Sequence, residues 1–250
     1  MGRRDESYRA TVVRLATAQK VAARSAPAYS RFVNRRLGRL LAAWAYRAGL
    51  SPNAVTAVSA GFTFSAVVLL AVLPPTWWLG ITVALLLVLG YAFDSADGQV
   101  ARLTGTGSAA GEWLDHIVDA TKVVTLPLAL LVGLYRAEAV SPSWLLVPLA
   151  NAVVSSVLFF AMILTEQLRR AAGVRSQAET AGRVPWLRSL LVIPTDYGVL
   201  CLLFALYGAT TLFMAAYAVI TLLTAAFLLL AAAKWFREIA ALGARDDVAL

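Results

Sequence analysis

The stretch WWLGITVALLLVLGYAFDSADGQVAR, residues Trp77–Arg102, joins a long apolar run to a charged end. Residues 77–93 include no charged side chain, and Asp94 and Asp97 follow where the run ends. A helix of about 20 apolar residues spans the roughly 30 Å hydrocarbon core of a bilayer. The stretch therefore predicts a membrane-spanning helix that carries two acids near one membrane surface.

The composition of the whole chain agrees with this interpretation. Of the 250 residues, 60% are hydrophobic and 14% are charged, whereas a soluble domain is near half apolar and a quarter charged. The formal charge is +8, and the Lys and Arg residues cluster in 1–47, in 166–188 and at the C-terminal end, beside the apolar runs. We therefore expect an integral membrane protein with lipid neighbours and no nucleic-acid partner. The single cysteine excludes an internal disulfide.

Similar apolar runs on both sides of this stretch predict six transmembrane helices and an all-α fold. Pro74 and Pro75 end the first helix, and Gly208 is the sole break between the last two. The expected helices run from about 52 to 73, from 77 to beyond 94, from 111 to 135, from 143 to 164, from a start between 187 and 196 to 207, and from 210 to 235.

An amphipathic segment precedes the first span. Apolar side chains recur at helical spacing from Val33 to Trp44, while Arg31, Arg35 and Arg39 lie four apart on another face. Such a helix is suited to an anionic membrane surface. We therefore divide the chain into a basic cytoplasmic tail at 1–28, an amphipathic interfacial helix at 29–50, a six-helix transmembrane domain at 51–236 and a cytoplasmic tail at 237–250.

Ala57, Gly61 and Ser65 form a ridge of small residues on the first predicted span. Ridges of this kind let two helices approach each other closely. We expect this ridge to pack inside the bundle, with a contact between the two subunits of a homodimer as the alternative.

The basic residues predict the orientation in the membrane. Six spans put both termini on one side, and that side carries 20 of the 22 Lys and Arg residues. Arg136 is on the other side, and Lys122 is inside the third span. Because basic loops stay in the cytoplasm, we expect a multi-pass cell-membrane protein with both termini and the loops at 103–110 and 166–188 in the cytoplasm.

Four acids gather at the cytoplasmic ends of the second and third spans. Asp94 and Asp97 are three residues apart and Asp115 and Asp119 are four apart, so each pair shares one helix face. Acids at such depth are costly, and they are functional candidates for that reason. Oxygen ligands without cysteine favour Mg²⁺, Mn²⁺ or Ca²⁺ over zinc. A structural charge network or a proton pathway is the alternative.

The residues between the two acidic pairs suit a phosphate ligand. Gly98 lets a ligand approach the helix closely, Ala101 keeps the region uncrowded, and Arg102 offers a rigid fork for phosphate. Residues 104–111, TGTGSAAG, are small and rich in hydroxyl groups, and they lead into a helix N-terminus, which favours anions. A carboxylate metal site beside these groups suits a diphosphate substrate.

Residues 94–119 resemble the signature of the CDP-alcohol phosphotransferase family, D-x2-D-G-x2-A-R-x8-G-x3-D-x3-D. The six predicted spans, the basic amphipathic helix and the Ser51-Pro52-Asn53 start of the first span are also similar to that family. The eight specified positions are all matched, by Asp94, Asp97, Gly98, Ala101, Arg102, Gly111, Asp115 and Asp119.

The resemblance implies a reaction and a role for each matched residue. Family members transfer a substituted phosphate from a CDP-linked alcohol to an acceptor alcohol and release CMP. Asp94, Asp97 and Asp115 would hold divalent metal, and Asp119 would bind a second ion and act as the general base. Two Mg²⁺ or Mn²⁺ ions are therefore expected. The cytidine diphosphate site would be shaped by Gly98, Ala101, Arg102 and Gly111, to which we add Asn53 and Ser108.

The acceptor is less constrained by the sequence. Lys122 could bind the acceptor or serve as a counter-ion, and Asp196 could bind it or cap a helix. Arg169 and Arg170 could bind an acceptor phosphate or anchor a helix to lipid headgroups. We expect CDP-diacylglycerol as donor and a polyol or polyol phosphate, such as inositol phosphate or glycerol phosphate, as acceptor. A choline- or ethanolamine-phosphotransferase-like reaction is the alternative, and a metal-ion or proton transporter is the alternative class.

Overall fold

The computed structural model describes residues 6–17, 27–174 and 196–246, and every element in these ranges is helical, as the sequence predicts. In chain order the elements are α1 (Tyr8–Thr17), the π-helical turn η1 (Ser30–Asn34), α2 (Arg35–Arg47), α3 (Pro52–Val72), α4 (Trp77–Thr104), α5 (Ala109–Arg136), the 3₁₀ turn η2 (Pro142–Leu145), α6 (Leu146–Ala171), α8 (Tyr197–Leu203), the 3₁₀ turn η5 (Phe204–Leu206) and α9 (Thr210–Asp246).

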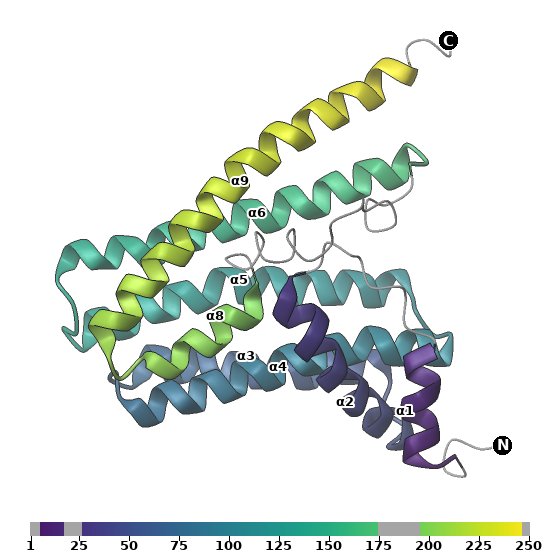
Figure 1. Cartoon of the computed structure of the whole chain (residues 1–250), viewed down its shortest axis with the longest axis horizontal. Coiled ribbons are helices and arrows are strands. Elements are labelled where there is room, and N and C mark those ends of the chain that lie inside the picture. The colour runs from purple at the N-terminus through teal and green to yellow at the C-terminus, as the bar shows by residue number, and fades with distance from the viewer. Residues whose placement is uncertain (1–5, 18–26, 175–195, 247–250) are drawn as a thin grey trace.

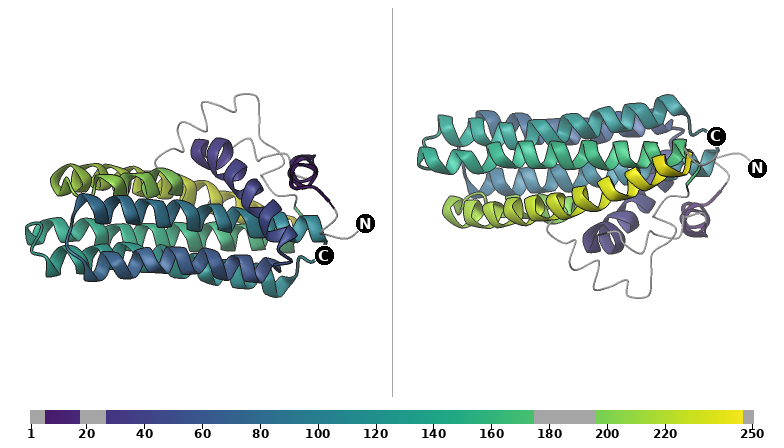
Figure 2. Two further views of the ribbon diagram at one scale, coloured as in Figure 1. Left: turned by 90° about the horizontal axis from the view of Figure 1, so that it is seen from below. Right: turned by 90° about the horizontal axis from the view of Figure 1, so that it is seen from above.

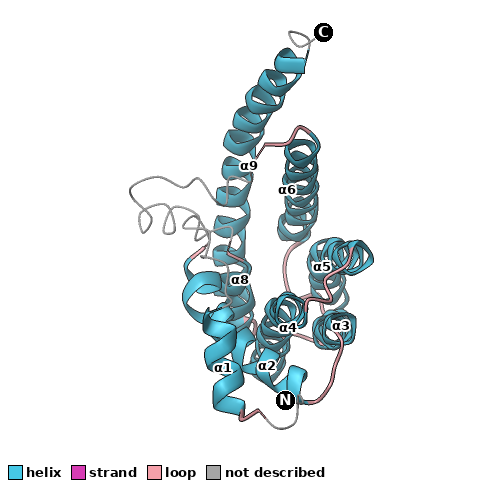
Figure 3. Cartoon of the chain, turned by 90° about the vertical axis from the view of Figure 1, so that its right-hand side faces the viewer, coloured by secondary structure: helices cyan, strands magenta, loops and turns pink. Residues whose placement is uncertain are grey.

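The long helices form a bundle in which α3, α4, α5 and α6 run side by side (Figure 1). Helix α3 packs against both α4 and α5, and α6 packs against α5. Helix α9 packs on α6 and crosses it at an angle, and α8 packs on α4 and α9 (Figures 1 and 3). Two aromatic side chains of this core, Phe204 and Phe213, are fully buried.

Within the described residues, five helices are long and apolar enough to cross a membrane, which indicates a membrane protein. These candidate spans are Pro52–Val72, Trp77–Thr104, Ala109–Arg136, Pro142–Ala171 and Thr210–Leu242. The remaining predicted span corresponds to the shorter apolar helix Tyr197–Leu206, and its predicted start before residue 196 lies outside the described residues. The total of six spans therefore stays a prediction.

Local chemistry explains where the spans begin and end. Ser51 caps α3, because its side chain accepts a hydrogen bond from Ala54 N. Helix α3 ends just before the predicted stop at Pro74 and Pro75. A turn at 207–209 separates η5 from α9, where Gly208 approaches Trp77 so closely that a Cβ atom would lie 2.6 Å from Trp77 N. Helix α9 continues to Asp246, past residue 235 where we predicted its end.

The N-terminal region contains a helix that the sequence did not predict. Helix α1 falls inside the segment that we took for a basic tail, and residues 1–5 and 18–26 of that segment lie outside the described residues. Leu15 is buried against α2, and the Tyr8 hydroxyl donates to Leu40 O at 3.0 Å. Figure 2 shows α1 and α2 together at one end of the bundle.

Helix α2 and the preceding turn occupy the predicted amphipathic segment. Its apolar side chains Val33, Leu37, Leu40 and Trp44 are exposed, which supports contact with lipid. The placement of this helix at a membrane surface stays a prediction.

The ridge of small residues on α3 does not pack inside the bundle. Ala57, Gly61 and Ser65 are all exposed, so that expectation is wrong. The buried face of α3 presents polar side chains instead, and Ser59 Oγ donates to Gly90 O of α4 at 2.8 Å. This hydrogen bond joins α3 to α4. The homodimer alternative is not tested.

Candidate active site

A short turn brings the two acidic pairs together. Helix α4 ends at Gly105, which has a positive φ of 66° that suits glycine. Helix α5 starts after Ser108, whose side chain accepts a hydrogen bond from Gly111 N at 3.1 Å. The chain therefore reverses within 105–108, and the last turns of α4 face the first turns of α5.

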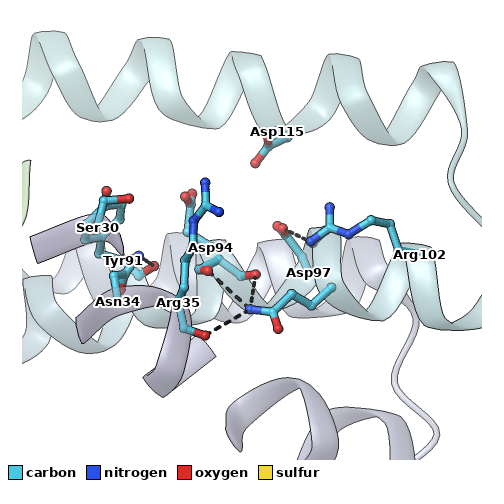
Figure 4. Close-up of a pocket in the computed structure, with 11 residues that line it drawn as sticks. Ser30, Asn34, Arg35, Tyr91, Asp94, Asp97, Arg102 and Asp115 are labelled. Carbon is cyan, nitrogen blue, oxygen red and sulfur yellow. Dashed lines mark hydrogen bonds between the residues drawn. The ribbon is translucent and has the colours of Figure 1, made fainter. Parts of the chain in front are cut away.

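Three carboxylates converge between these helices. Oxygen atoms of Asp94, Asp115 and Asp119 all lie within 4.8 Å of one another. Figure 4 shows Asp115 pointing from α5 toward the side of α4 that carries Asp94 and Asp97. Carboxylate oxygens at this spacing fit a hard divalent ion such as Mg²⁺ or Mn²⁺. The term acid cluster is used below for Asp94, Asp97, Asp115 and Asp119.

Asp97 has a different environment from the other three acids. It is 7% exposed, and its carboxylate accepts hydrogen bonds from Thr56 Oγ1 at 2.6 Å and from Gly98 N at 2.5 Å. Asp97 is not one of the three converging carboxylates. The predicted role of Asp97 as a metal ligand is therefore untested, while its link to α3 is evident.

Lys122 lies among the acids and contacts two of them. Its side chain is buried, and Nζ donates to Asp94 Oδ1 at 2.5 Å and to Asp119 Oδ1 at 2.7 Å. This geometry supports the counter-ion alternative, because one ammonium group bridges carboxylates from two helices. The acids of the cluster still outnumber this lysine, so a divalent cation remains compatible with the site.

A cavity of about 360 Å³ opens beside the acids. Asp94, Asp97, Asp115, Gly98 and Arg102 line it. A Cβ atom at position 98 would lie 3.3 Å from Arg102 Nη1, so glycine leaves room for the guanidinium one turn later. The cavity therefore combines carboxylates with a guanidinium, a group whose geometry suits phosphate.

The other predicted nucleotide residues are arranged around the turn. A Cβ atom at Gly111 would lie 3.1 Å from Asn53 Oδ1 and 3.3 Å from Ser108 Oγ. These three residues are thus neighbours, although the described lining of the cavity does not include them. Ala101 is half-buried on α4. Their roles in nucleotide binding remain predictions.

The structure also reveals cavity residues that the sequence analysis assigned elsewhere or passed over. Ser30, Asn34, Arg35 and Tyr91 line the cavity, although we had placed Arg35 on the basic face of an amphipathic helix suited to a membrane surface. The sequence feature that could have indicated these cavity residues was Asn34, a polar residue within the helical pattern. Its side chain is 2% exposed and donates to Tyr91 O at 3.0 Å.

Arg169 and Arg170, predicted to bind the acceptor, are engaged with carboxylates. Arg169 makes a two-pronged contact with Glu238 of α9, at 3.1 and 2.6 Å, and Arg170 Nη1 lies 2.6 Å from Glu112 of α5. Glu166 is near both arginines. We call these five residues the arginine–glutamate cluster, and it links α5, α6 and α9.

Asp196 caps α8, in agreement with the helix-cap alternative. Its carboxylate accepts from Gly198 N at 3.1 Å and from Tyr29 N at 2.7 Å. Burial raises the pKa of this carboxyl. Asp196 therefore ties the start of the amphipathic segment to α8, and a role in acceptor binding stays a prediction.

The polar groups deep in the bundle bear on the transporter alternative. Asn151 of α6 donates to Thr221 Oγ1 at 3.1 Å and accepts from the Tyr217 hydroxyl at 2.9 Å. These bonds join α6 to α9, which is a structural use of the polar groups.

A comparison with protein families identifies the chain's relatives. The family model described as CDP-alcohol phosphatidyltransferase matches residues 49–244. That range contains the whole acid cluster and all five candidate spans. No curated protein matches the chain significantly.

Proposed function

Because the chain belongs to the CDP-alcohol phosphatidyltransferase family, we propose that it transfers a substituted phosphate from a CDP-alcohol to an acceptor alcohol and releases CMP. The family consists of transferases that use a CDP-alcohol and an alcohol acceptor, and it generally depends on divalent metal. The observation that carries the proposal for this chain is the convergence of three carboxylates beside a cavity that also holds Arg102.

The acid cluster would hold the metal. Asp94, Asp115 and Asp119 supply converging oxygen donors, and Asp97 lies one turn from Asp94. Bound Mg²⁺ or Mn²⁺ would neutralise the diphosphate and make CMP a better leaving group. We expect two ions, with Asp119 serving the second.

The remaining residues position the substrate and move the proton. Arg102 would bind diphosphate oxygens, since guanidinium groups match phosphate in a bidentate way. Asp119 would accept the proton of the acceptor hydroxyl as general base. Lys122, which contacts Asp119, would hold that carboxylate in place. Phosphoryl transfer requires mainly such positioning and charge stabilisation.

The donor is proposed to be CDP-diacylglycerol and the acceptor a polyol or polyol phosphate. The basic residues of the segment 166–188 support an anionic acceptor. Use of a CDP-linked choline or ethanolamine with a lipid acceptor is the alternative that the assay below distinguishes.

The deciding assay uses the purified full-length protein in detergent with Mg²⁺ or Mn²⁺. A panel of CDP-alcohols is combined with a panel of acceptors, and CMP release is measured. CMP release that depends on both CDP-diacylglycerol and a polyol acceptor supports the proposal. Release only with CDP-choline or CDP-ethanolamine and diacylglycerol supports the alternative, and the absence of CMP release with every pair contradicts the proposed activity.

We also propose that the site faces the cytoplasm in a cell membrane, with both termini on that side. The distribution of Lys and Arg supports this orientation. The native cysteine, Cys201, is buried, so single cysteines can be introduced for labelling. Gly107→Cys should react with an impermeant reagent only after permeabilisation, and Glu138→Cys should react from outside. The reverse pattern would contradict the orientation.

A further inference from the structure

The cavity beside the acid cluster has a second basic side chain that the proposed function does not use. Arg35 of α2 lines it together with Asp94, Asp97, Asp115 and Arg102. In Figure 4, Arg35 extends from α2 and Arg102 from α4, and both side chains line the same cavity as Asp94 and Asp97. Guanidinium groups from two different helices therefore line the cavity that also holds the carboxylates.

The backbone around Arg35 is held against α4. The Asn34 side chain donates to Tyr91 O at 3.0 Å, and Gln99 Nε2 contacts Arg35 O at 3.4 Å. One turn later, a Cβ atom at Gly38 would lie 2.7 Å from Ser95 Oγ, so only glycine permits this approach of α2. These contacts fix the helix position from which the guanidinium enters the cavity.

The guanidinium of Arg35 lacks a counter-ion within the described part of the chain. No described carboxylate lies at ion-pair distance from it, in contrast to Arg169 and Arg170. Burial lowers the pKa of Arg35, which reflects the cost of removing a cation from water. A guanidinium nevertheless stays charged, and an anion that enters the cavity would offset this cost.

We propose that Arg35 binds a phosphate group in this cavity, which it lines together with Arg102. The proposal rests on the proposed function only for the source of the phosphate, which is the diphosphate of a CDP-alcohol or the phosphate of an acceptor. Arg35 lies before residue 49, where the family match begins, so the site is completed from outside the matched region. This assigns the amphipathic segment a direct part in substrate binding.

The neighbouring arginines provide a matched control. Arg36 follows Arg35 directly and is exposed, so its removal changes the net charge by the same amount without altering the cavity wall. The Arg31 guanidinium lies over the Phe32 ring, 5.1 Å from its centroid. The comparison of Arg35→Gln with Arg36→Gln therefore separates a local phosphate contact from a general charge effect.

The experiment measures ligand affinities of the full-length protein in detergent with Mn²⁺ by calorimetry. The probes are inorganic pyrophosphate, CDP, CMP and, for the acceptor arm, inorganic phosphate added to CMP-saturated protein. Arg35→Gln should weaken pyrophosphate and CDP by about 10-fold to 100-fold, as expected for a hydrogen-bonded charge, and CMP by less. Arg35→Lys should retain part of the affinity, and Arg36→Gln should stay within about twofold of wild type.

The outcomes distinguish the source of the phosphate. If Arg35→Gln leaves pyrophosphate and CDP unchanged but weakens inorganic phosphate, Arg35 binds the acceptor phosphate and the proposal stands. If all probes stay within twofold, or if Arg36→Gln weakens them equally, the proposal is overturned. The midpoint of thermal unfolding checks that each variant is folded. If Arg35→Gln fails to fold, the affinities of Arg35→Lys are compared with wild type instead.

The same series separates this inference from the proposed function. Wild-type protein that binds pyrophosphate but not CDP contradicts the CDP-alcohol reaction, while the pyrophosphate affinities of the Arg35 variants still decide the role of Arg35. CMP release with an unchanged affinity series supports the reaction and overturns the inference. Wild-type protein that binds none of the probes contradicts both.

Discussion

The acid cluster and the arginine–glutamate cluster lie at the same end of the bundle, but their charges are arranged differently. In the arginine–glutamate cluster each arginine contacts a carboxylate of another helix. In the acid cluster the carboxylates outnumber Lys122, and a cavity opens beside them. Paired charges between helices fasten the bundle, whereas unbalanced charge beside a cavity is available to bind a cation and a substrate.

The largest difference between the two clusters is expected when a carboxylate is removed from the acid cluster. Asp94→Asn should lower turnover by about 10³-fold or more, because it removes a converging oxygen donor and a partner of Lys122. CMP release measures the effect, and calorimetry with Mn²⁺ should show weakened metal binding. Chelator should likewise abolish wild-type activity, and added Mg²⁺ or Mn²⁺ should restore it. Full activity in excess chelator would indicate that the acid cluster has a structural role and does not bind a catalytic metal.

A second test separates catalysis from binding within the acid cluster. Asp119→Asn should lower kcat by about 10²–10⁴-fold, the usual effect of losing a general base, with little change in CDP affinity. Arg102→Ala should do the opposite and weaken CDP binding more than it lowers kcat. Turnover and CDP affinity are measured for both variants. If Asp119→Asn loses metal and CDP as severely as Asp94→Asn does, its main role is metal binding.

A third test concerns the internal cation. Lys122→Met should destabilise the metal-free protein by about 3–5 kcal/mol, because two carboxylates lose a buried partner. The same change should increase Mn²⁺ affinity, since the negative charge of the site is no longer partly neutralised. Thermal unfolding with and without Mn²⁺ and calorimetry check both effects. A stability loss with unchanged Mn²⁺ affinity would mean that Lys122 acts on packing alone.

The smallest effects on activity are expected in the arginine–glutamate cluster. Arg169→Ala should lower thermal stability, because its buried guanidinium makes a two-pronged contact with Glu238. Arg170→Ala should cost less than about 1 kcal/mol, since that pair is exposed. Both variants should keep kcat and KM near wild type in CMP-release assays. A rise in KM for the acceptor would instead support the acceptor role that the sequence suggested.

The acid cluster could be predicted from sequence because its geometry is local. Spacings of three and four residues on two helices, joined by a short turn, are enough to bring Asp94, Asp115 and Asp119 together. The five candidate spans were predictable for a similar reason, since the length and hydropathy of each run determine a helix without information about its neighbours.

Contacts between residues far apart in the sequence could not be predicted in this way. Arg169 and Glu238 are 69 residues apart, and Tyr29 and Asp196 are 167 apart, so their pairing depends on tertiary packing. The amphipathic pattern placed Arg35 on a basic face, but it could not indicate which basic side chain turns into the bundle. That choice follows from the contacts of Asn34 and Gly38 with α4.

The length of α9 has a mechanical consequence. Its 37 residues extend about 55 Å at 1.5 Å per residue, while the hydrocarbon layer is only about 30 Å thick. A tilt of about 20° would reduce the extent along the membrane normal only to about 52 Å. Helix α9 is therefore longer than the hydrocarbon layer requires, and the contact between Arg169 of α6 and Glu238 ties the C-terminal part of α9 to α6.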